Sequence, residues 1–225
     1  MKEPPDRDSI RASYDRLAAE YSVRIFDELD GKPIDCGLLD EIAARANGPV
    51  CDLGCGPGHA ARYLSEHGAA VCGMDLSPAM IAEARRLNPD LDFEVADMRS
   101  LPFADRSLGA AVALYSLIHF EDGDLSTACK EIARVLIPDG LLLASFHRGS
   151  TTTHLDELWG KVIDLDFHFF EPEQIEDVLT ASGFAVERLI EREPYKGVEV
   201  ETRRFYIVAS NAADPKRSIA HDQTC

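Results

Sequence analysis

The feature that most constrains this chain is the glycine-rich stretch from Pro49 to His59, which reads Pro-Val-Cys-Asp-Leu-Gly-Cys-Gly-Pro-Gly-His. A short apolar run ends at Asp52, three glycines follow at every second position, and residues 60–64 have helical spacing. This order predicts a strand, a tight turn and a helix start, because glycine permits unusual backbone conformations and close approach of a ligand. We therefore expect an α/β fold with a ligand at this turn.

The loop differs from the two best-known phosphate-binding loops. A dinucleotide fingerprint requires a glycine where His59 stands, and no Gly-Lys-Ser/Thr follows as in a Walker A loop. Pro57 also removes one backbone N–H donor that a phosphate would use. Because a carboxylate beside the ligand repels a pyrophosphate but attracts a sulfonium or ammonium group, Asp52 favours a cationic ligand.

Residues 52–58, Asp-Leu-Gly-Cys-Gly-Pro-Gly, resemble the first motif of class I S-adenosylmethionine (SAM)-dependent methyltransferases. The similarity continues to the last expected strand. It implies a Rossmann-like, doubly wound sheet of seven strands in the order 3-2-1-4-5-7-6, with the last strand antiparallel. It also implies SAM as the cofactor and methyl transfer to an O, N or C nucleophile of a small molecule.

The expected elements follow from apolar periodicity and from stop signals. Helices are expected at 9–29, 35–46, about 59–68, 78–87, 125–136 and 172–182, and strands at 50–53, 69–74, 91–96, 108–117, 141–146, 184–191 and 199–209. Residues 134–140 resemble a family turn in which Asp139 replaces a glycine, a change that aspartate tolerates. We expect a helical lid at 1–47, a SAM-binding domain at 48–210 with an insertion at 147–171, and a disordered tail at 211–225.

Several residues are expected to hold the cofactor. Asp75 ends the second expected strand and can accept hydrogen bonds from ribose hydroxyls; the alternative, a helix cap, is better filled by Ser77. The resemblance places Asp97 and Met98 near adenine, although Asp97 is alternatively a loop acid without a ligand. The other expected cofactor contacts are Tyr14, Tyr21, Asp52, Gly54, Cys55, Gly56, Leu76, Met80, Tyr115 and Ser116. The two N-terminal tyrosines resemble a lid segment of the family, and simple helix packing is the alternative.

His119 is the expected general base, since an unperturbed imidazole is half-ionised near neutral pH. Alternatively it caps the following helix or only shapes the pocket. Within the insertion, His147, Trp159 and His168 are the expected acceptor-binding residues, and a surface insertion held by Trp159 is the alternative.

The composition limits the kinds of partner that the protein is expected to bind. A formal net charge of −17 disfavours nucleic acid, and no apolar run is long enough to suggest a membrane partner. Six cysteines without a C-x-x-C pair suggest thiols in a reducing cytoplasm, and no metal site is expected. The sequence leaves monomer and homodimer open. A non-catalytic SAM- or nucleoside-binding protein on the same fold remains the alternative function.

Overall fold

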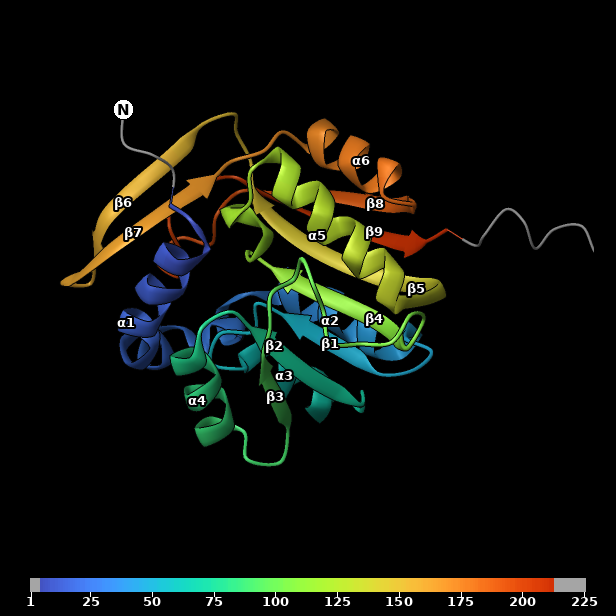
Figure 1. Cartoon of the computed structure of the whole chain (residues 1–225), viewed down its shortest axis with the longest axis horizontal. Coiled ribbons are helices and arrows are strands. Elements are labelled where there is room, and N and C mark those ends of the chain that lie inside the picture. The colour runs from blue at the N-terminus through green and yellow to red at the C-terminus, as the bar shows by residue number, and fades with distance from the viewer. Residues whose placement is uncertain (1–4, 213–225) are drawn as a thin grey trace, which may run out of the picture.

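The computed structural model describes residues 5–212. Its centre is a seven-stranded sheet in the order β3-β2-β1-β4-β5-β9-β8 (Figure 1). The strands are β1 (Val50–Leu53), β2 (Val71–Asp75), β3 (Asp92–Val95), β4 (Leu108–Leu114), β5 (Leu136–His147), β8 (Phe184–Arg192) and β9 (Arg204–Asn211). The first five are parallel, and β9 runs antiparallel to both of its neighbours. Two further strands lie outside this sheet and do not count in the expected order. In that order β8 is therefore the sixth strand and β9 the seventh, and the expected order is confirmed.

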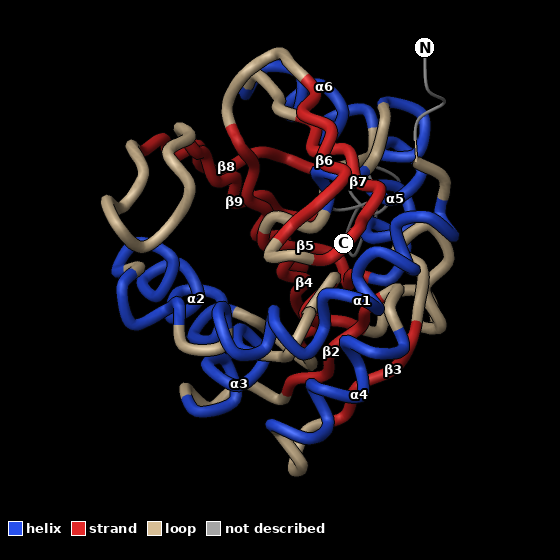
Figure 2. Tube along the Cα trace, turned by 90° about the vertical axis from the view of Figure 1, so that its left-hand side faces the viewer, coloured by secondary structure: helices blue, strands red, loops and turns tan. Residues whose placement is uncertain are grey.

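Helices cover both faces of the sheet (Figure 2). The helices that follow or precede the strands are α2 (Pro33–Arg45), α3 (His59–Glu66), α4 (Pro78–Leu87), α5 (Asp122–Val135) and α6 (Pro172–Ala181). Apolar side chains of α2 and α3 pack on one face, whereas those of α5 and α6 pack on the other. Strand β4 is buried along almost its whole length, as expected for a central strand covered on both faces.

The N-terminal helix α1 (Arg7–Ile25) lies across the end of the sheet, against α4 and the hairpin described below. Its contact surface is a small apolar cluster of Leu17, Ala18, Met80, Ile163 and Leu165. The expected helix 9–29 ends four residues early, because a separate 3-10 helix, η1 (Glu28–Gly31), follows. The expected tail at 211–225 falls almost wholly outside the described residues, although β9 continues to Asn211.

The segment 147–171 forms a two-stranded antiparallel hairpin of β6 (Thr152–Leu158) and β7 (Lys161–His168). Trp159 lies in its turn with a φ of 52°. Strand β5 begins earlier than expected, at Leu136, and Asp139 takes a φ of 62°, the conformation that aspartate was expected to tolerate.

Strand β9 begins at Arg204, five residues later than expected. The preceding loop is held by Glu199, which forms ion pairs with Arg192, Lys32 and Arg204. All four side chains are at most 5% exposed. This buried ion network lies in the segment 199–203, which was expected to belong to the last strand. No helix among the described residues is long and apolar enough to cross a membrane.

Candidate active site

The glycine loop follows β1 and is shaped by the elements around it. Gly54, Gly56 and Gly58 have φ values of 69°, 52° and 82°. A Cβ on Gly54 would lie 2.3 Å from the Cβ of Ser116, and a Cβ on Gly58 would lie 2.7 Å from the ring of Phe93. Two of the three glycines are therefore required by protein packing as well as by backbone conformation.

Gly56 differs because its missing side chain leaves space in a cavity. A Cβ there would meet only Tyr21, at 3.8 Å. Its backbone N–H donates to Oδ2 of Asp75 over 2.9 Å, and the N–H of Ser77 donates to Oδ1 over 2.8 Å. Asp75 thus joins the glycine loop to the start of α4, and its remaining lone pairs are available to a ligand. Burial raises the pKa of Asp75 to about 6, although these backbone hydrogen bonds lower it.

Asp52 does not lie where the sequence suggested. Its side chain is 2% exposed, and its Oδ2 accepts the backbone N–H of Ala61 over 3.1 Å, beneath the loop. Burial raises the pKa of Asp52 to about 6. Asp52 is absent from the cavity lining. Its carboxylate, which was expected beside the ligand, therefore lies outside the cavity lining, and its hydrogen bond stabilises the first turn of α3.

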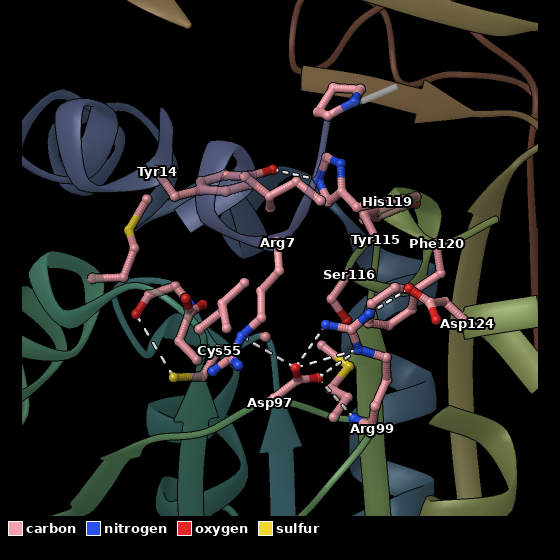
Figure 3. A pocket seen from close by; sticks show the side chains of 18 of the residues that line it. Arg7, Tyr14, Cys55, Asp97, Arg99, Tyr115, Ser116, His119, Phe120 and Asp124 are labelled. Atoms are coloured by element: carbon pink, nitrogen blue, oxygen red, sulfur yellow. Dashed lines mark hydrogen bonds and ion pairs between the residues drawn. The ribbon is translucent and has the colours of Figure 1, made fainter. Parts of the chain in front are cut away.

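A second acid, Asp97, follows β3 and is held by two arginines (Figure 3). Arg99 donates to both carboxylate oxygens, and Nε of Arg7 on α1 lies 3.3 Å from Oδ2. Burial alone would raise the pKa of Asp97, but hydrogen bonds and charge from Arg99 lower it below its usual value. Arg99 also pairs with Asp124, so this network links β3, α1 and α5.

A cavity of about 700 Å³ runs from the glycine loop to the hairpin. Most expected site residues line it: Tyr14, Tyr21, Gly54, Cys55, Gly56, Asp75, Leu76, Met80, Asp97, Met98, Tyr115, Ser116, His119 and His168. Two expected acceptor-binding residues, His147 and Trp159, do not line the cavity. The ring of His147 stacks beside Tyr115 and Phe169, and burial lowers the pKa of His147 to about 4. Trp159 packs on Tyr21 and Arg24 instead.

His119 lies in η2 (Leu117–His119), directly after β4, and both of its ring nitrogens have partners. Nδ1 lies 2.8 Å from the carbonyl oxygen of Asp166 on β7, and Nε2 lies 2.6 Å from the Tyr14 hydroxyl. Because a carbonyl only accepts, Nδ1 carries the hydrogen and Nε2 accepts from Tyr14. Burial lowers the pKa of His119 to about 4, so the ring is neutral at pH 7.

The sequence missed two lining residues at the glycine-loop end of the cavity. Glu28 of η1 lies 3.3 Å from Nε2 of His59, while Nδ1 of His59 is buried without a hydrogen-bond partner. Burial alone would raise the pKa of Glu28, but His59 and Lys32 lower it to about 2. An anion and an imidazole therefore meet at one end of the cavity. The position of His59 directly after the third glycine was the one signal for it in the sequence.

These residues fit SAM. The cavity volume lies within the range of small-molecule sites. Asp75 and Asp97 both line the cavity, Gly56 leaves open space beside it, and Glu28 and His59 supply an anion and an imidazole at its glycine-loop end. No group of three or more His, Cys, Asp or Glu residues within 5–212 is arranged for a metal ion.

Comparison with known proteins decides the family. A family model described as a methyltransferase domain matches residues 50–140. A malonyl-[acyl-carrier protein] O-methyltransferase of Halorhodospira halophila is 30% identical over 227 residues, covering 94% of this chain and 74% of the relative. The chain belongs to the class I SAM-dependent methyltransferases. Its cofactor is SAM, and it is an enzyme of the methyltransferase type.

Other methyltransferases resemble it over shorter stretches or in fold. A demethylmenaquinone methyltransferase of Beutenbergia cavernae is 35% identical over 107 residues, covering 48% of this chain and 44% of the relative. The structure of DhpI in complex with S-adenosylhomocysteine (SAH) has a TM-score of 0.71 at 21% identity, covering 92% and 98% of the two chains. At that identity the likeness concerns the methyltransferase fold alone.

Proposed function

We propose that this methyltransferase transfers the methyl group of SAM to a small molecule bound between the carboxyl ends of β4 and β5 and the hairpin β6–β7. The observation that supports the proposal is the hydrogen bond from the N–H of Gly56 to Asp75 in the cavity, which sets a carboxylate suited to ribose hydroxyls beside the glycine loop. A net charge of −17 disfavours a nucleic-acid acceptor.

The cofactor residues divide by position along the cavity. Asp75 accepts the ribose hydroxyls, while Asp97 and Met98 border the adenine. Gly54, Cys55, Gly56 and Tyr21 surround the methionine chain, whose ammonium and carboxylate groups pair with Glu28 and His59. Bound SAM supplies an electrophilic methyl group on a sulfonium, and holding it against the acceptor can provide much of the rate.

In this proposal His119 is a positioning residue, not the general base that the sequence suggested. Its Nε2 lone pair already accepts the Tyr14 hydroxyl, and the ring is neutral at pH 7. His119, at the end of β4, instead forms hydrogen bonds with Tyr14 of α1 and with the carbonyl of Asp166 on β7. This arrangement closes the cavity beside Tyr115 and Ser116, where the methyl group would lie.

Calorimetry and a transfer assay test the proposal. SAM and SAH should bind, Asp75→Asn should weaken binding by about 10- to 100-fold, and the exposed Asp90→Asn should not. Incubation with methyl-labelled SAM and a metabolite extract should produce SAH and a labelled small molecule. Failure of SAH to bind would refute the proposal, whereas binding without SAH formation would favour the non-catalytic alternative.

A further inference from the structure

Glu199, in the loop between β8 and β9, is a buried carboxylate outside the cavity with several donors around it. Its Oε1 accepts the backbone N–H of Tyr195 over 2.8 Å and lies 3.2 Å from Nη1 of Arg204. Arg192 donates to both carboxylate oxygens, and Oε2 lies 3.6 Å from Nζ of Lys32. Burial alone would raise the pKa of Glu199, but the hydrogen bonds from Arg192 and Tyr195 lower it below its usual value. Glu199 is therefore an anion held in one position.

Lys32 connects this anion to the cavity. Its Nζ lies 2.8 Å from Oε2 of Glu28 and 3.6 Å from Oε2 of Glu199. Glu28 lines the cavity, and its other oxygen, Oε1, lies 3.3 Å from Nε2 of His59. The side chains of Lys32 and Glu199 are each 4% exposed, so solvent screens their charges only weakly. The ammonium of Lys32 is thus shared between two carboxylates, of which Glu28 faces the cavity.

This sharing matters for a cationic group that binds at Glu28. The positive charge of Lys32 attracts the Glu28 carboxylate and repels any second cation brought to it. The negative charge of Glu199 offsets that repulsion from the other side of Lys32. If Glu199 were neutral, the charge of Lys32 would bear on Glu28 alone, and an ammonium in the cavity would be bound less tightly.

We propose that Glu199 is a positioning residue for the cofactor, which shares the Lys32 ammonium and so leaves Glu28 with the negative charge that the SAM ammonium group requires. This inference rests on the proposed function, in which Glu28 pairs with that ammonium. It gives the loop between β8 and β9 a part in cofactor binding from outside the cavity. A Glu199 that only stabilised its loop would not distinguish ligands with and without the amino-acid group.

Glu199→Gln removes the charge and keeps the shape of the side chain. SAH affinity should fall about tenfold, while the affinity for methylthioadenosine, which lacks the amino-acid group, should stay unchanged. Glu201→Gln, at an exposed position of the same loop, is the control and should change neither affinity. An unchanged SAH affinity in Glu199→Gln, or an equal loss of both ligands, would overturn the inference. Failure of the unaltered protein to bind SAH would instead refute the proposed function.

Lys32→Gln tests the same balance in the opposite direction. Glutamine keeps an N–H donor for Glu28 but removes the positive charge beside it, so SAH affinity should rise about threefold and methylthioadenosine affinity should not change. This test does not depend on the folding of Glu199→Gln, in which buried cations lose their partner. An unchanged or lower SAH affinity in Lys32→Gln would overturn the inference.

The double variant Lys32→Gln with Glu199→Gln separates charge balance from loop structure. It loses one cation and one anion, so the net charge of the network is that of the unaltered protein. SAH affinity should return to within about threefold of the original value. Thermal unfolding of each variant gives the folded fraction, to which the calorimetric affinities refer. A tenfold loss that persists in the double variant would show that Glu199 acts through the structure of its loop, and would overturn the inference.

Discussion

The hydroxyl of Tyr14 donates to Nε2 of His119 over 2.6 Å, and this bond joins α1 to the segment that follows the central strand. Two further contacts hold α1 over the cavity. Asp15 accepts from the Ser77 hydroxyl at 2.6 Å, and Arg7 pairs with Asp97. These three contacts anchor α1 to the segments that follow β4, β2 and β3.

The Tyr14–His119 bond should be measurable as a coupling in stability. Tyr14→Phe and His119→Phe each leave a buried polar partner unsatisfied, so the double variant should lose less than the sum of the two. We expect a coupling free energy of about 0.5–1.5 kcal/mol from urea unfolding. Hydrogen exchange of α1 amides should quicken in both single variants. Additive losses would show that the bond contributes nothing.

Gly54→Ala should damage both the fold and SAM binding. The new methyl group would meet Ser116 at 2.3 Å and Met98 at 2.9 Å, at a φ of 69°. Strain and overpacking together predict a loss of about 2–5 kcal/mol of unfolding free energy. Thermal unfolding and SAH calorimetry check both effects.

Gly37→Ala is the matched control for that change. Gly37 lies within α2, and nothing stands within 4 Å of a Cβ there. Alanine favours helix, so the protein should gain about 0.5–1 kcal/mol and bind SAH normally. Equal losses at Gly37 and Gly54 would contradict the close-approach explanation.

The sheet order and the glycine loop could be predicted because both depend on local signals, namely apolar runs, turn residues and a contiguous motif. The direction in which each acidic side chain points could not be predicted. Asp52 is the last residue but one of β1 and Asp75 is the last residue of β2, yet Asp52 turns under α3 while Asp75 faces the cavity. Both acids accept backbone N–H groups, but which N–H groups each one meets depends on the packing of the next helix, which the sequence does not display.

Long-range partners were missed for the same reason. The sequence suggested a free imidazole at His119, because its hydrogen-bond donor Tyr14 lies 105 positions away and cannot be inferred from local residues. Glu28 and His59 are likewise 31 positions apart (59 minus 28) and meet only through the 3-10 turn after α1. Residues 199–203 were expected to begin the last strand, but Glu199 forms buried ion pairs there instead.

Glu28→Gln and His59→Gln should each weaken SAH binding about 10- to 100-fold, the usual effect of removing a hydrogen bond to a charged group. Methylthioadenosine lacks the amino-acid part of SAH, so its affinity should be the same in wild type and in both variants. Asp27→Asn, beside Glu28 but with a side chain 76% exposed, is the control variant. An equal loss of methylthioadenosine binding would place both residues away from the zwitterion.

SAH affinity should depend on pH through Asp75. Burial raises the pKa of Asp75 to about 6 in the free protein, and only the ionised form accepts two ribose hydroxyls. Bound ligand stabilises that form and lowers its pKa. Affinity should therefore be constant above about pH 7 and fall, by up to about tenfold per pH unit, as the pH drops through 6. Calorimetry from pH 5 to 8 measures this slope. Asp75→Asn should bind more weakly at pH 8 and lose the slope, because no proton then competes with the ribose; a slope that survives in Asp75→Asn would assign the titration to another group.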